Sequence, residues 1–124
     1  MKLFFIFFVL SFYSLNAQNY QTADVKELLV VDIIIHKNAY EILAIENRVD
    51  TIRILSQKEK VNDRCKFVKI KKGKIYKFQL SATPSTYDNL VVRLGNEVFW
   101  KSGDDIKYYP YFAINVIDKY IVLL

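Results

Sequence analysis

Short apolar runs separated by polar turns recur along the chain, and this pattern predicts strands. Residues 28–35 are almost continuously apolar and rich in β-branched side chains, as expected for a strand buried on both faces. Residues 40–46 predict a second strand, and residues 51–54 alternate polar and apolar with the period of two that is typical of a half-buried strand. Capping-box spacing at residues 24–27 predicts a short helical turn before the first strand.

Two glycine turns in the second half of the chain predict β-hairpins. Residues 67–70 lead into a turn at Gly73, and the alternating residues 75–80 follow it. Residues 90–94 and 97–100 flank a two-residue Gly-Asn turn, which is typical of a tight hairpin. Each of these glycines can adopt the positive φ that such turns require.

The spacing of these segments predicts an all-β domain. Residues 111–124 are also strand-like, with a break expected at Asp118 and Lys119. Seven or eight short strands, with a turn every eight to twelve residues, are typical of a sandwich or a barrel. Because the hairpins imply antiparallel pairing and the connections vary in length, we expect a small antiparallel β-sandwich of immunoglobulin-like type.

The first seventeen residues have the order of a secretory signal peptide. Lys2 supplies a positive charge, residues 3–10 are all apolar, and the small residue Ala17 precedes Gln18. A membrane anchor is the alternative, but the stretch is shorter than the roughly 20 apolar residues that a spanning helix needs. We therefore expect cleavage after residue 17, a single domain at residues 18–124, no transmembrane segment after cleavage, and a location in the periplasm, outside the cell or at its surface.

Few residues of the chain suggest catalysis or metal binding. His36 is the only histidine and Cys65 the only cysteine, so no internal disulfide can form and a clustered zinc site has too few ligands. Cys65 is either buried or paired with a partner. No motif supports a nucleophile pair of these two residues, and the aspartates at 88, 104 and 105 lie in turn-like sequence rather than in a calcium loop. We expect no catalytic residue, no metal and no cofactor.

The net charge of +5 comes from one stretch of the chain. Residues 58–77 hold nine basic and two acidic residues. On the predicted hairpin, five lysines form a candidate basic patch: Lys69, Lys71, Lys72, Lys74 and Lys77. Such a patch can attract an anionic glycan, lipopolysaccharide or nucleic acid, or it can protect an exposed sheet edge from aggregation. We favour edge protection, and we predict no specific nucleic-acid binding.

Aromatic residues are concentrated between residues 99 and 112. Phe99 and Trp100 should point to opposite faces of their strand, so one should be core and the other exposed or shielded. Exposed tyrosine and tryptophan rings can stack on sugars or pack on a partner protein. The candidate binding residues are Trp100, Tyr108, Tyr109 and Tyr111.

These observations predict an exported, non-catalytic binding or interaction module at the bacterial cell envelope. Its partner is unknown, with an envelope protein or a glycan as the two candidates. Two alternatives stay open. One is a structural or assembly subunit that offers its C-terminal strand, residues 120–124, to a partner, and the other is a secreted enzyme with an unrecognised site.

Overall fold

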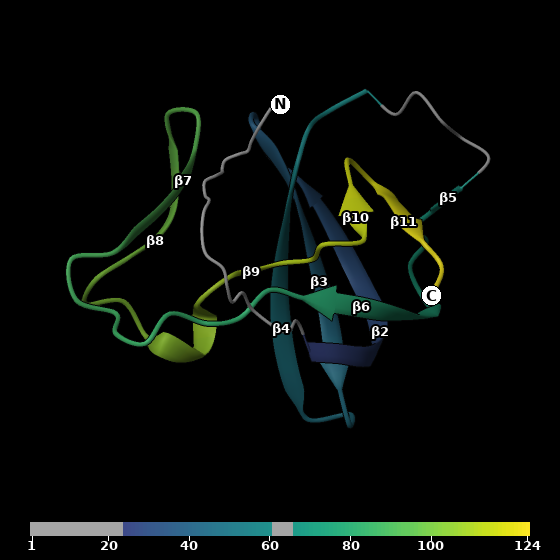
Figure 1. Cartoon of the computed structure of the whole chain (residues 1–124), viewed down its shortest axis with the longest axis horizontal. Coiled ribbons are helices and arrows are strands. Elements are labelled where there is room, and N and C mark those ends of the chain that lie inside the picture. Colours follow the sequence, from purple (N-terminus) through teal and green to yellow (C-terminus); the bar gives the residue numbers. More distant parts are fainter. Residues whose placement is uncertain (1–23, 61–65) are drawn as a thin grey trace, which may run out of the picture.

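The computed structural model describes residues 24–60 and 66–124, and nearly all of its regular elements are strands (Figure 1). The predicted signal peptide and Cys65 lie outside the described residues. The elements are β2 (Asp24–Ile35), β3 (Ala39–Glu46), β4 (Asp50–Gln57), β5 (Phe67–Lys69), β6 (Ile75–Leu80), β7 (Val91–Leu94), β8 (Glu97–Lys101), the 3-10 turn η1 (Ile106–Tyr108), β9 (Tyr111–Phe112), β10 (Val116–Ile117) and β11 (Tyr120–Val122).

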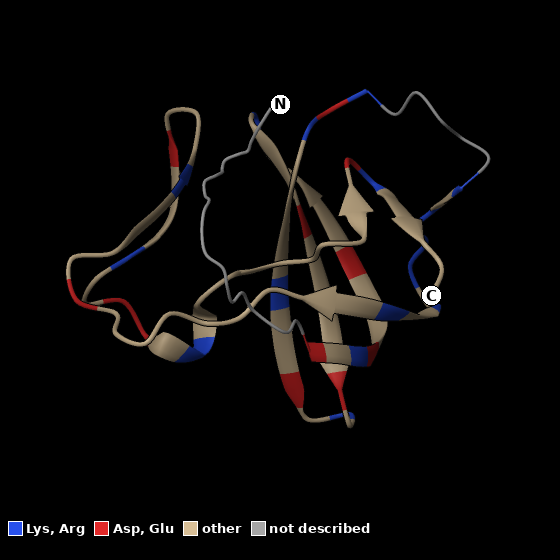
Figure 2. Cartoon of the chain, viewed as in Figure 1, with Lys and Arg blue, Asp and Glu red and all other residues tan. Residues whose placement is uncertain are grey.

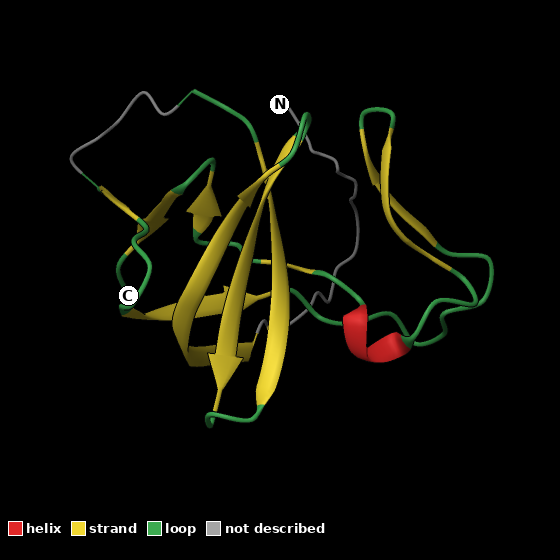
Figure 3. Ribbon diagram, turned by 180° about the vertical axis from the view of Figure 1, so that it is seen from behind, coloured by secondary structure: helices red, strands yellow, loops and turns green. Residues whose placement is uncertain are grey.

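A curled five-stranded sheet, in the order β6-β2-β3-β4-β9, forms the body of the domain (Figure 3). Its pairs are antiparallel except for β4 with β9, which is parallel. The residues after β9 reach back to the opposite edge, where Ala113 bridges Leu80 of β6. The backbone N–H of Ser81 also donates to the carbonyl of Phe112 at 2.7 Å. The two edges of the sheet are therefore linked through one short segment.

The main core fills the inner face of this curled sheet. Its fully buried side chains include Leu28, Ile42, Ile54 and Phe78. A second sheet, in the order β10-β11-β5, adds Ile121 to the same core. Burial of so many aliphatic and aromatic groups is the main force that holds the domain together.

One buried asparagine joins the two sheets. The Oδ1 of Asn115 accepts from the backbone N–H of Gln79 at 2.8 Å. Its Nδ2 donates to the carbonyls of Lys77 at 2.9 Å and of Val122 at 3.0 Å. Because all three bonds go to backbone groups, this buried amide is satisfied and fixes β6 beside the last strand.

The β7–β8 hairpin lies beside the sheet and carries a second, smaller core (Figure 1). Trp100 and Val92 from the hairpin pack with Leu55 of β4. Gly95 takes a φ of +60° in the two-residue turn. A Cβ at this position would come within 2.9 Å of the Asn38 side chain, so the turn needs glycine both for its backbone and for its space.

Much of the strand prediction is confirmed. The described part of the chain is all-β and mainly antiparallel, the Gly-Asn hairpin forms, and the break at Asp118 and Lys119 separates β10 from β11. The predicted helical turn at residues 24–27 is wrong. These residues begin β2, because their backbone pairs with β6 from Asp24 to Leu29, and that pairing outweighs a local capping signal.

The predicted hairpin of residues 67–70 with residues 75–80 is also wrong. β5 pairs with β11, whereas β6 pairs with β2. Gly73 does adopt a positive φ, of +83°, but its N–H donates to the carbonyl of Val30 at 2.8 Å. The turn thus docks on β2 instead of closing a hairpin, because each flanking strand finds a partner elsewhere. The alternation within β6 is confirmed, with Tyr76, Phe78 and Leu80 all buried.

Candidate functional site

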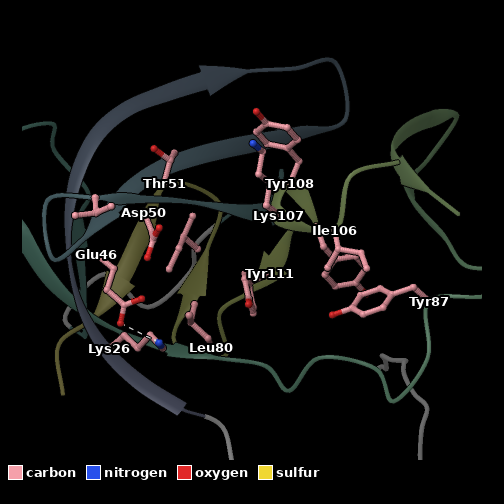
Figure 4. A pocket seen from close by; sticks show the side chains of 13 residues that line it. Lys26, Glu46, Asp50, Thr51, Leu80, Tyr87, Ile106, Lys107, Tyr108 and Tyr111 are labelled. Atoms are coloured by element: carbon pink, nitrogen blue, oxygen red, sulfur yellow. Dashed lines mark hydrogen bonds and ion pairs between the residues drawn. The ribbon is translucent and has the colours of Figure 1, made fainter. Parts of the chain in front are cut away.

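A groove of about 560 Å³ opens between the turn end of β3 and β4 and the segment around η1 (Figure 4). Four tyrosines contribute to it, together with acidic, basic and aliphatic side chains from distant parts of the chain. We call it the aromatic groove. Its lining residues are Lys26, Glu46, Val49, Asp50, Thr51, Ile52, Leu80, Tyr87, Ile106, Lys107, Tyr108, Tyr109 and Tyr111.

The turn between β3 and β4 forms the charged wall of the groove. Asn47 and Arg48 take positive φ values of 53° and 64°, which reverses the chain tightly and places Asp50 opposite Glu46. Lys26 of β2 donates to the Glu46 carboxylate at 2.9 Å. The pKa of Lys26 is raised, chiefly by this hydrogen bond and against the effect of burial, so the ammonium group stays charged.

The η1 turn forms the aromatic wall. Asp105 caps it, because its side chain accepts from the backbone N–H of Lys107 at 3.1 Å. The cap directs the exposed ring of Tyr108 to the groove, with the Lys107 ammonium group 5.2 Å from the ring centroid (Figure 4). Tyr111, at the start of β9, lines the same cavity.

Tyr109 and Tyr87 link the groove to the second core. The ring of Tyr109 packs edge-to-face with Trp100, at a centroid distance of 5.0 Å, and with Tyr87 at 5.2 Å. Burial raises the pKa of Tyr109, and the neighbouring Tyr87 and Tyr111 raise it further. The Tyr109 hydroxyl therefore keeps its proton over the ordinary pH range.

The structure corrects the role expected for Trp100. Its side chain is only 1% exposed, and its Nε1–H donates to the carbonyl of Asp105 at 3.0 Å. The ring is thus not available to a ligand and instead supports the aromatic wall from behind. Phe99, the next residue along β8, is half-buried and packs edge-to-face on His36 at 5.0 Å, so the two neighbours do occupy different environments.

Three of the four predicted aromatic residues come together in the groove, but most of its lining residues were not predicted from the sequence. Tyr87 lies in a polar loop without periodicity, and Glu46 and Asp50 flank residues that the sequence marks only as a turn. The wall around Lys26 depends on the pairing of β2 with β3 and β6, for which the sequence carries no local signal.

Behind the aromatic wall lies a partly buried ionic cluster around the buried side chain of Glu41. The Glu41 carboxylate accepts from Arg53 Nε and lies 2.7 Å from His36 Nε2. Arg53 Nη1 also donates to the carbonyls of Phe99 at 3.2 Å and of Tyr108 at 2.7 Å. Arg53 therefore ties the sheet both to the hairpin and to the segment that carries the groove tyrosines.

His36, the only histidine of the sequence, belongs to the same cluster. The second ring nitrogen of His36, Nδ1, lies 3.4 Å from a Glu97 carboxylate oxygen. Both ring nitrogens of His36 thus face carboxylates. In the described part of the chain, no group of three or more His, Cys, Asp or Glu side chains is placed to hold a metal ion.

The ionic cluster makes the free energy of unfolding depend on pH. Burial by itself would raise the pKa of Glu41, but hydrogen bonds from Arg53 and His36, together with their charges, outweigh it and hold this pKa below the ordinary value of 4.5. A carboxyl whose pKa is lowered by folding stabilises the native state above its unfolded pKa. That contribution disappears as the pH falls through the folded pKa.

We therefore expect the free energy of unfolding to decrease more steeply below about pH 4.5 in the wild type than in Glu41→Gln. Urea unfolding of both proteins at pH values from neutral to acid measures this difference, and carboxyls outside the ionic cluster contribute equally to the two curves. Parallel curves for the two proteins would show that Glu41 is not stabilised in its charged form.

The predicted basic patch is spread over three elements. All five of its lysines are exposed, but they lie on β5, on the turn that follows it and on β6 (Figure 2). Lys69 lies on the edge strand of the three-stranded sheet, where a lysine disfavours pairing with another chain. Lys72 lies 3.7 Å from Asp32, and Lys77 is paired across the sheet with Glu27, so nearby carboxylates offset part of the charge.

Comparison of the chain with known protein families, with curated proteins and with solved structures finds no match. Within the described residues, no helix has the length and apolar character needed to cross a bilayer.

Proposed function

We propose that the protein is an exported, non-catalytic binding protein of the bacterial cell envelope, and that its ligand occupies the aromatic groove. The observation that carries this proposal is the gathering of four tyrosines with acidic and basic groups in one cavity of about 560 Å³. Ligand sites are typically concave, of about 300–1,000 Å³, with aromatic walls and a few polar groups that orient the ligand. The groove has each of these properties.

The way in which the groove is held supports a binding role. Its aromatic wall is anchored by Arg53 through the Tyr108 carbonyl and by Trp100 through the Asp105 carbonyl. Both anchors come from strands and are largely buried. A site fixed in advance loses little conformational entropy when its ligand binds, and this preorganisation favours affinity.

Neither alternative has a comparable observation in its favour. An assembly role was predicted to use the last strand, but β11 lies between β10 and β5, and both of its backbone edges are paired. For a catalytic role the sequence offers no motif, and in the part of the chain that the structure describes both ring nitrogens of His36 are paired with carboxylates. An immunoglobulin-like sandwich stays a prediction, and the binding proposal requires only the all-β scaffold.

The export part of the proposal rests on the order of charge, apolar run and small residue within residues 1–17. Mass spectrometry of the protein from its native host should give an N-terminus at or near Gln18. Recovery of a form that retains Met1 would contradict cleavage.

Binding is tested by retention on isolated envelope fractions. We expect Tyr108→Ala to lower retention at least several-fold, because it removes an exposed ring of the groove while leaving the backbone bond to Arg53 in place. Phe112→Ala is the matched control, since this ring is also exposed, lies close in the chain and does not line the groove. Equal retention of the wild type and both variants would contradict a groove-bound ligand.

A further inference from the structure

The charges around the aromatic groove balance. Its lining includes two basic residues, Lys26 and Lys107, and two acidic ones, Glu46 and Asp50. Lys26 is paired with Glu46 at 2.9 Å, so neither charge is offered singly to a ligand. Lys107 lies 4.0 Å from Asp105, so Asp50 is left as a single unpaired carboxylate in the described lining of the groove. The groove therefore lacks the large excess charge of one sign that attracts an anionic or a cationic ligand.

The rings of the groove are also not arranged to enclose a cation. The Lys107 ammonium group already lies near the face of Tyr108, 5.2 Å from its centroid. Tyr87 and Tyr109 pack edge-to-face with each other and with Trp100, so their ring contacts are largely used within the protein. An aromatic cage for an ammonium ligand needs several free ring faces directed at one point, and this groove does not provide them.

Hydroxyl groups are the ligand chemistry that the lining fits best. Asp50 is exposed and has no ion-pair partner among the described residues, so its carboxylate can accept hydrogen bonds from a ligand. The Tyr87, Tyr108 and Tyr111 side chains surround the same space, and each phenol can both donate and accept (Figure 4). Beside them, Ile106 and Val49 supply apolar surface.

We infer that the aromatic groove binds an uncharged, hydroxyl-rich ligand, namely a neutral oligosaccharide. Hydroxyls of the sugar would donate to Asp50, and an apolar C–H face would pack on the exposed side chains of Tyr108 and Ile106. The inference rests on the proposed function and narrows its ligand to one chemical class.

The test compares three oligosaccharides of similar length and different charge: a neutral, fully N-acetylated chitin oligosaccharide, an acidic oligogalacturonate and a cationic, deacetylated chitosan oligosaccharide. Fluorescence of Trp100, the only tryptophan of the sequence, reports on binding because its ring contacts Tyr87 and Tyr109 of the groove. We expect the neutral probe to bind at least about tenfold more tightly than either charged one, with an affinity that added salt barely changes.

Variants connect this preference to the groove. Asp50→Ala should weaken binding of the neutral probe by about tenfold, because a charged acceptor is lost. Glu27→Ala, which removes an exposed carboxylate outside the groove, should leave binding unchanged.

Tighter binding of a charged probe overturns the inference. So does failure of all three probes to bind while retention on envelope fractions still depends on Tyr108, since that combination points to a protein ligand. Retention on envelope fractions that is independent of Tyr108 instead contradicts the proposed function itself. Failure of the inferred ligand class and failure of the proposed function are therefore distinguishable.

Discussion

Arg53→Met is expected to destabilise the domain by about 3 kcal/mol, at the lower end of the cost of breaking a buried ion pair, because it removes the guanidinium that pairs with the Glu41 carboxylate. The Arg53 and Glu41 side chains are 18% and 8% exposed, so water reaches the carboxylate poorly, and His36 at 2.7 Å replaces only part of the lost interaction. The carbonyls of Phe99 and Tyr108 lose a donor at the same time. Urea unfolding at neutral pH measures the loss, and a change of less than about 1 kcal/mol would contradict this role.

A double variant distinguishes the cost of leaving a buried charge unpaired from the cost of losing side-chain packing. Replacing both members of a buried ion pair with apolar residues of similar size is often nearly neutral. Glu41→Met combined with Arg53→Met should therefore be clearly more stable than Arg53→Met alone. A double variant less stable than either single one would show that the two side chains contribute mainly by filling space.

Trp100→Ala is expected to cost about 3–5 kcal/mol, because it removes the largest buried side chain and leaves a cavity in the second core. The Asp105 carbonyl also loses its hydrogen bond from the indole. The aromatic wall should loosen, so that binding and stability are lost together. Thermal unfolding measures the stability of the variant.

Tyr108→Ala is the comparison for this variant. The Tyr108 side chain is 53% exposed, so its removal should change the free energy of unfolding by no more than about 0.5 kcal/mol. Similar destabilisation by Trp100→Ala and Tyr108→Ala would contradict the division between a supporting ring and a ligand-facing ring.

The sequence predicted local structure better than it predicted partners. The β-branched runs and the alternation in residues 51–54 specify strands, because side-chain shape and the two faces of a sheet are local properties. Residues 67–70 and 75–80 are both recognisable as strands in the same way. Their pairing is not local: β5 and β6 join strands far away in the chain, and a glycine turn between them says only that the chain reverses.

For the candidate site, too, the sequence predicted one wall of the groove and not the other. The density of tyrosines near residue 108 identified one wall of the groove from sequence. The other wall comes from the β3–β4 turn, which has the composition of an ordinary turn. Arg53 was expected on the polar face of its strand. It is largely buried there because the hairpin and the segment around η1 pack on that face and accept its hydrogen bonds.

The most direct test of a groove-bound ligand is an NMR titration of the isotopically labelled protein with a soluble glycan fraction of the envelope. We expect the largest amide shift changes in two segments, residues 46–52 and residues 106–111, which form the two walls of the groove. Changes concentrated instead at the lysines of residues 69–77, or no change at saturating ligand, would contradict this expectation.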